Sequence, residues 1–285
     1  MLNELLNRYP SLCECKDDIE NAAKAIIDCY EKGGKLLICG NGGSCADCEH
    51  IVGELMKGFL KKRPLSESQK AEMKSRCDLV DDELLSKLQG GLPAVAIPSI
   101  HALNSAFCND VDPELVYAQP LMSLANENDI LVGISTSGNS KNVFGAVKVA
   151  KALGIKVIGL TGKTGGKLKD TADICICAPE AETFKIQELH LPIYHYICAA
   201  VEEHFFKNRF KFECFGSSLN ALAKELRIIR RKNIQVLRTD YILAYARLHT
   251  NPSNWIKVKH FRRSALLFVI RVRKRTGVKK PGFFT

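Results

Sequence analysis

Residues 35–44 read KLLICGNGGS, a short apolar run that leads directly into a glycine-rich turn. Apolar residues without alternation are typical of a strand buried on both faces of a parallel sheet. The run predicts a first strand over Lys35–Cys39, and four similar runs follow: Ala94–Ile97, Asp129–Ile134, Ile155–Leu160 and Asp173–Cys177. Helical stretches between them imply right-handed crossovers. We therefore predict the α/β class, with a three-layer sandwich around a five-stranded parallel sheet.

The helical stretches are defined by apolar periodicity and by glycines that stop them. The pattern predicts helices over Asp17–Glu31, Cys45–Leu60, Asn139–Leu153 and Thr183–Lys207. Residues 61–91 are highly charged, with only modest helical patterning. We interpret this stretch as an insertion at the rim of the sheet that forms a solvated pair of surface helices.

The charge of the chain divides it into two parts. The net charge is +10, yet residues 215–285 carry 17 Lys and Arg against only Glu225 and Asp240, while the preceding residues are net acidic. All 12 cysteines lie at or before Cys214. We predict one domain over residues 1–213 and a basic, largely helical extension over residues 214–285. The extension is either a solvated appendage or an arm for an anionic partner such as RNA, DNA or an acidic membrane surface.

Several classes of protein are excluded by the sequence. No apolar run approaches the roughly 20 residues that a transmembrane helix needs. Glu4 and Arg8 interrupt the amino-terminal apolar pattern, which therefore does not resemble a secretory signal. Scattered cysteine spacings without an export signal favour reduced thiols over a disulfide framework. We expect a cytoplasmic protein.

Two loops follow predicted strands and lead into predicted helices. The first is Gly40–Ser44 and the second is Ser135–Ser140. Open α/β sheets bind ligands at the carboxyl ends of strands, and a helix amino terminus favours an anion. Uncharged hydroxyl donors are added by Ser135, Thr136, Ser137 and Ser140. Each loop alone could be only a tight turn, but two on successive crossovers indicate a phosphate site.

Ionisable side chains form a second candidate site. His50 and Glu54 are four residues apart and share a helix face, which suits a divalent ion, an acid/base pair or a surface hydrogen bond. The last helix carries Gln187, His190 and His195 among apolar residues, where a metal or a plain core role would satisfy the imidazoles. Gln187 and His195 are separated by about 12 Å along an unbroken helix. They could reach one ion only if Pro192 kinks the helix; we favour the alternative, sites shared between neighbouring subunits.

Taken in order, these motifs are similar to the sugar isomerase (SIS) domain family and, within it, to the phosphoheptose isomerases. The resemblance covers roughly residues 2–207. It rests on Cys39–Ser44 followed by His50 and Glu54, on Gly133–Ser140, on Leu160–Lys163 with Gly165–Lys167, and on Ile186–Glu188 with His195. Family members often have Asp-Arg before the Ile-Gln-Glu, where this chain has Phe184-Lys185.

The resemblance implies a ketose–aldose isomerase that acts in heptose and surface-carbohydrate biosynthesis. It would convert sedoheptulose 7-phosphate to D-glycero-D-manno-heptose 7-phosphate through an enediol(ate), as a homotetramer with active sites between subunits. One divalent zinc ion per subunit is implied, with His50, Glu54, Gln187 and His195 as ligands. Glu54 and His195 match the catalytic pair. The implied substrate-binding residues are Asn41, Gly42, Gly43, Ser44, Asp110, Ser135, Thr136, Ser137, Ser140 and Gln187.

The residue types suit this chemistry. Moving a proton between neighbouring carbons requires a base such as a carboxylate, and an acid must move the oxygen protons. We expect Glu54 to carry the carbon proton and His195 to serve the oxygens or ring opening. The alternative is a non-catalytic SIS protein that senses a phosphosugar and acts as a regulator, or as a nucleic-acid scaffold through the basic extension. Such a sensor would not need Glu54, Gln187 and His195 together.

Overall fold

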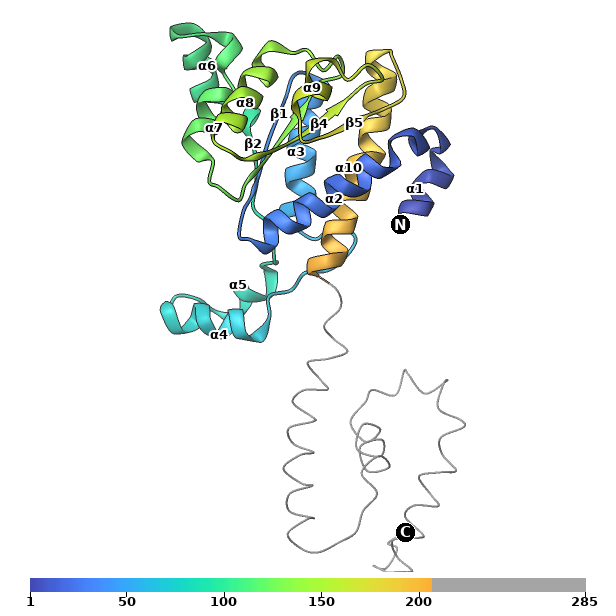
Figure 1. The fold of residues 1–285 in the computed structure, drawn as a ribbon. Coiled ribbons are helices and arrows are strands. Elements are labelled where there is room, and N and C mark those ends of the chain that lie inside the picture. The colour runs from blue at the N-terminus through green and yellow to red at the C-terminus, as the bar shows by residue number, and fades with distance from the viewer. Residues whose placement is uncertain (207–285) are drawn as a thin grey trace, which may run out of the picture. The chain divides into compact units, whose positions relative to one another are not determined.

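A computed structural model describes residues 1–206, and the predictions for the basic extension, residues 214–285, lie outside the described residues. The described part is built around one sheet of five parallel strands in the order β2-β1-β3-β4-β5 (Figure 1). The strands are β1 Leu36–Gly40, β2 Ala94–Ala96, β3 Ile130–Ile134, β4 Lys156–Thr161 and β5 Ile174–Cys177. The predicted α/β class and five-stranded parallel sheet are confirmed. Each strand begins and ends within one residue of its prediction.

Helices cover both faces of the sheet and make it the middle of three layers (Figure 1). One face carries α2 Lys16–Glu31, α3 Gly43–Met56 and α10 Thr183–Phe205, and the short α1 Leu2–Arg8 contacts α10. The other face carries α7 Ala118–Leu124, α8 Lys141–Ala152 and α9 Gly166–Thr171, with α6 His101–Asp110 beyond them. Short 3-10 helices span Pro10–Cys15, Ile97–Ser99 and Pro113–Leu115.

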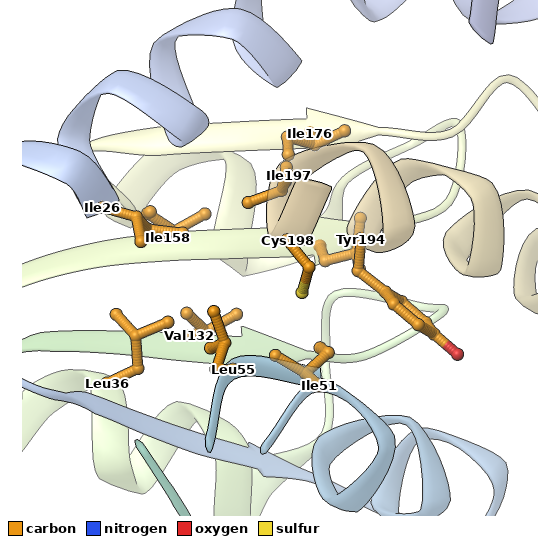
Figure 2. A pocket seen from close by; sticks show the side chains of 11 residues that line it. Ile26, Leu36, Ile51, Leu55, Val132, Ile158, Ile176, Tyr194, Ile197 and Cys198 are labelled. Carbon is orange, nitrogen blue, oxygen red and sulfur yellow. The ribbon is translucent and has the colours of Figure 1, made fainter. Parts of the chain in front are cut away.

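The two faces of the sheet bury separate apolar cores. The α2, α3 and α10 side is the larger, and it encloses a cavity of about 30 Å³ lined by aliphatic side chains, Cys198 and the Tyr194 ring. Figure 2 shows the Cys198 sulfur directed into this cavity and the Tyr194 hydroxyl directed away from it. A water needs about 10–15 Å³ of such space, so the cavity is large enough for one, but its apolar lining offers a water no strong polar partners. The cavity is a packing defect beneath α10.

The charged insertion forms two short helices, α4 Glu67–Arg76 and α5 Asp82–Lys87, that extend away from the sheet (Figure 1). Leu85 is the one buried residue of these two helices. This matches the expected solvated helix pair. Arg63 is an exception, because its side chain is fully buried although the sequence places it in a charged, apparently solvated run.

The strand order creates the place where a ligand can bind. β1 lies between β2 and β3, so the chain leaves β1 toward one face and β3 toward the other. In sheets of this order the crevice between two such strands is the usual ligand site. The loops Gly40–Ser44 and Ser135–Ser140 follow β1 and β3, so the structure brings both predicted phosphate loops to this point.

Candidate active site

The first loop contacts helix α8, which follows the second loop, across the crevice between β1 and β3. The Asn41 and Asn142 side-chain amides exchange two hydrogen bonds of 2.8 and 2.9 Å. The Tyr117 hydroxyl lies 2.9 Å from the Gly40 carbonyl oxygen and also 2.9 Å from the Asn41 side-chain oxygen. Asn41 is thus fixed from both α8 and the α7 layer.

The serine-rich loop is also tied to itself. The Ser135 and Ser140 hydroxyls lie 2.9 Å apart, and the Asn139 N–H donates to the Ser137 hydroxyl at 3.2 Å. Gly138 has a φ of +65°, and a Cβ there would lie 1.8 Å from the Gly165 carbonyl oxygen. Only glycine fits such a position. Backbone and hydroxyl groups therefore form a preorganised turn at the start of α8.

The residues predicted to bind the phosphate differ in their exposure to solvent. Ser44 and Ser135 are buried, whereas Ser137 is exposed and Thr136 and Ser140 are half-buried. Gly42 and Gly43 are exposed at the amino terminus of α3. A bound anion would therefore meet backbone N–H groups, the Ser137 hydroxyl and the partly exposed hydroxyls. The Ser44 side chain packs against Gly40 instead.

Three of the predicted catalytic and metal-binding side chains meet further along the same helices. His50 and Glu54 lie on successive turns of α3, and His195 lies on α10, which packs against α3. The His50 Nε2 atom is 3.4 Å from Glu54 Oε1 and 3.4 Å from His195 Nε2. His50 is the shared member of both pairs, and its side chain is 42% exposed.

A partly buried chain of polar groups orients His50. Its Nδ1 atom lies 3.0 Å from the Tyr194 hydroxyl, which donates to Asp47 Oδ1 at 3.1 Å. Because the hydroxyl proton goes to Asp47, Tyr194 can accept the Nδ1–H of His50. This tautomer leaves the Nε2 lone pair free to face Glu54 and His195. Partners of this kind are typical of histidines that bind a metal.

The local electrostatics keep His195 neutral near pH 7. Burial and then the neighbouring His50 lower the pKa of His195, and they outweigh the opposing effect of Glu54. Burial also raises the pKa of Asp47, although the hydrogen bond from Tyr194 opposes that shift. A neutral imidazole retains a lone pair for a metal or a proton.

Gln187 does not join this group. A Cβ on Gly43 would lie 2.6 Å from the Gln187 amide nitrogen, so Gln187 packs over the first residue of α3. α10 continues as one helix through Pro192, and about 12 Å of helix therefore separates Gln187 from His195. Likewise, about 15 Å of α3 separates Ser44 from Glu54. Within one chain, the first phosphate loop therefore lies at the start of α3, whereas Glu54 lies near the end of α3 and His195 lies midway along α10.

Comparison with known proteins identifies the family. The chain matches the SIS domain over residues 6–90 and again over residues 105–197. It is 39% identical over 192 residues to the phosphoheptose isomerase of Aneurinibacillus thermoaerophilus, which covers 67% of this chain and 84% of that protein. The chain belongs to the SIS domain family. A second phosphoheptose isomerase, from a Nitratiruptor species, is 37% identical over 67% of this chain and 89% of its own length.

Solved structures agree with this assignment to the SIS domain family. The phosphoheptose isomerase of Francisella tularensis superposes with a TM-score of 0.55 at 31% identity, covering 71% of this chain and 98% of that one. The enzyme from Neisseria gonorrhoeae gives a TM-score of 0.52 at 29% identity, covering 70% and 98%. This SIS protein is therefore an isomerase, and its class of substrate is sugar phosphates.

Two pairs of the expected metal ligands in the SIS domain have a spacing that can be compared with that of zinc ligands. Bonds of about 2.1 Å place neighbouring tetrahedral ligands about 3.4 Å apart, which is the spacing in both His50 pairs. Within residues 1–206, no three His, Cys, Asp or Glu side chains are arranged to hold an ion together. The donor types suit zinc, but the set is incomplete without a rearranged or added ligand.

Two residues singled out in the sequence lie elsewhere. Asp110 ends the exposed helix α6, where its carboxylate accepts a hydrogen bond from Asn109. Among residues 1–206, no hydrogen bond joins its side chain to either phosphate loop. His190 is fully buried, and its Nε2 atom lies 3.1 Å from the Thr161 carbonyl oxygen. Of the two interpretations left open for His190, the structure supports the core histidine, because its side chain is buried against the end of β4.

Other site residues were not predicted from the sequence. Tyr194 and Asp47 orient His50, and Asn142 holds Asn41. A signal for Asp47 was present, since it precedes His50 by three residues and so shares its helix face. The signal for Tyr194 and Asn142 was weaker, because their partners are more than 100 residues away in sequence.

Two further properties of the described part concern its helices and its cysteines. None of the helices within residues 1–206 combines the length and apolar character needed to cross a membrane. All eleven cysteines of that part are free thiols.

Proposed function

We propose that this SIS isomerase converts sedoheptulose 7-phosphate to D-glycero-D-manno-heptose 7-phosphate. The observation that carries the proposal is the meeting of His50, Glu54 and His195 at 3.4 Å spacings on α3 and α10. The named activity of the relatives supports the choice of substrate. A heptose product is consistent with a role in surface-carbohydrate synthesis.

Glu54 is the proposed carbon base. It removes a proton from C1 of the open-chain ketose and returns it to C2, through an enediol. His195, neutral near pH 7, moves the proton between the two oxygens, from O1 to O2. The Glu54 side chain is 13% exposed, so the carboxylate is reachable yet largely shielded from water. Shielding strengthens its interaction with the reacting carbons.

We further propose one zinc ion per subunit, held by His50, Glu54 and His195, with Gln187 as the further ligand. A bound zinc ion would polarise the substrate carbonyl and stabilise the charge that develops on its oxygen. Because Gln187 packs over Gly43, far from His195 in its own chain, the proposal requires Gln187 from a neighbouring subunit.

The same separation supports an oligomer, proposed here as a homotetramer. The serine-rich loop of one subunit would hold the phosphate while His50, Glu54 and His195 of another face the carbonyl end. The substrate would then bridge two subunits. This arrangement uses the exposed edge of His50, which faces away from its own core.

The test is incubation of the full-length, zinc-loaded protein with sedoheptulose 7-phosphate, followed by chromatographic detection of an aldose phosphate. Formation of the aldose supports the proposal. Binding of the ketose without any turnover would favour the alternative, a phosphosugar-sensing regulator. Absence of both binding and turnover would exclude this substrate.

A further inference from the structure

A fully buried ion pair joins the segment after α3 to the last turns of α10. Arg63 Nε donates to Glu202 Oε1 at 2.7 Å, and the two side chains are 0% and 1% exposed. Charged side chains are almost never fully buried unless they are paired. Burial of such a pair is weak evidence for stability, since dehydration opposes the attraction. Its contacts must therefore explain its role.

Glu202 organises the backbone of the turn that follows α3. Besides Arg63, its two oxygens accept the N–H groups of Phe59, Leu60 and Lys61 at 2.8–3.1 Å. Burial alone would raise the pKa of Glu202, but these bonds, led by that from Phe59, lower it overall. Glu202 is thus an ionised anchor for four donors.

The remaining Arg63 donors reach the end of α3. Nη1 donates to the Leu55 carbonyl at 2.6 Å, and Nη2 donates to the Glu54 carbonyl at 3.1 Å. The last carbonyls of a helix lack helical partners, and a cation there is favourable. Arg63 therefore holds the backbone of the proposed base itself.

Glu202 also acts on the other half of the proposed catalytic pair. Phe59, whose N–H it accepts, places its ring against His195, with ring centroids 5.4 Å apart. Glu202 follows His195 by seven residues, so the two lie on nearly the same face of α10. One ion pair thus contacts the segments that hold Glu54 and His195.

We propose that Arg63 and Glu202 form a positioning pair that keeps Glu54 and His195 in register. The inference rests on the proposed function for its catalytic meaning. Neither side chain touches the reacting atoms. The role depends on the forked guanidinium, which bonds Glu202 and two carbonyls at once, as a lysine ammonium cannot in the same geometry.

The test is Arg63→Lys in the full-length protein, with Glu202→Gln as a second variant. Lysine preserves the charge that neutralises Glu202, so a purely charge-balancing role predicts unchanged kcat. A positioning role predicts that kcat falls on the order of 100-fold, as for a small misplacement of catalytic groups, while KM stays nearly constant.

The control for lost stability is Val147→Ala, which opens a void in the core on the opposite face of the sheet. Its kcat per folded molecule is expected to match the wild type. Hydrogen exchange supplies a readout independent of turnover: amides of 54–57 should exchange faster in Arg63→Lys but not in Val147→Ala.

Wild-type kcat and wild-type exchange in Arg63→Lys would overturn the positioning role. Equal losses of kcat in Arg63→Lys and Val147→Ala would also overturn it, since both would then reflect stability. Failure of the wild-type protein to isomerise sedoheptulose 7-phosphate would instead contradict the proposed function. In that case the exchange of residues 54–57 still decides whether Arg63 fixes this turn.

Discussion

The two phosphate loops differ from the group of His50, Glu54 and His195 in how their polar groups are satisfied. In the loops, at the starts of α3 and α8, Asn41 bonds Asn142 and Ser135 bonds Ser140, so the loops are neutral and already paired. The second group consists of ionisable side chains further along the helices. His50 and Glu54 lie about two to three turns after the start of α3, His195 lies about two turns after Gln187 on α10, and His50 faces both of the others. Under the proposed function, the paired loops would hold the phosphate and the ionisable group would exchange protons. One subunit would then separate binding from chemistry.

The largest expected effect on turnover comes from a change in the group of His50, Glu54 and His195. Glu54→Gln removes the base but keeps the shape of the side chain, so we expect kcat to fall about 1,000-fold, within the usual range for a general base. Binding of inorganic phosphate, measured by calorimetry, should be unchanged. Glu49→Gln, an exposed carboxylate of the same helix, is the matched control. Retained turnover in Glu54→Gln would contradict the assignment of proton transfer to Glu54.

The second prediction concerns His190, which lies on α10 between Gln187 and His195. Burial lowers the pKa of His190 from 6.5 to about 4. Between these values the unfolded chain binds a proton that the folded chain excludes, so its contribution is complete above pH 6.5 and is lost as pH falls. The free energy of unfolding should fall by about 2 to 3 kcal/mol between pH 7 and pH 4.5 because of this group.

Urea unfolding at both pH values checks the His190 prediction. His190→Gln should lose less stability on acidification than the wild type, while His101→Gln, at an exposed site, should behave as the wild type does. An identical pH dependence in His190→Gln would show that the core histidine is not the titrating group.

The third prediction sharpens the account of His50. Tyr194→Phe removes the hydroxyl between Asp47 and His50, so the imidazole loses the partner that sets its tautomer. We expect turnover to fall about 10-fold, as for other partners of metal-binding histidines. Tyr196→Phe, two residues further along α10, should have little effect. Equal activities of the two variants would contradict the role of Tyr194.

The smallest effect on the kinetics is expected from a change in the serine-rich loop. Ser137→Ala removes one exposed hydroxyl from the serine-rich loop, and a hydrogen bond of this kind contributes about 1 kcal/mol. KM for the phosphosugar should therefore rise about 5-fold, with kcat unchanged. Steady-state kinetics of Ser137→Ala beside Ser123→Ala, an exposed serine of α7, measures this. A fall in kcat instead would mean that this loop takes part in the chemistry.

Local sequence patterns predicted the sheet well because each strand is an uninterrupted apolar run bounded by polar or small residues. The same reasoning placed both loops at the carboxyl ends of β1 and β3, which the strand order then brings together. It also paired His50 with Glu54, because their spacing alone sets their helix face. Properties that depend on neighbouring residues in sequence were therefore accessible.

Properties that depend on residues distant in the sequence could not be predicted from local patterns. The helix predicted to end at Leu60 ends at Met56, because Glu202, more than 140 residues away, takes the N–H groups of the following turn. Arg63 looked solvated for the same reason, since only α10 reveals its partner. His190 and His195 have similar sequence surroundings, yet one faces the core and the other faces α3.

The cavity beneath α10 makes this part of the molecule sensitive to hydrostatic pressure. Unfolding eliminates this void and so decreases the volume of the system, which means that hydrostatic pressure favours the unfolded state. The void adjoins Ile51 on α3 and Ile197 on α10, the helices that carry the proton-transferring groups. The NMR chemical shifts of the methyl groups of these two residues should therefore change at kilobar pressures. They would report how the packing of α3 and α10 on the sheet changes under pressure.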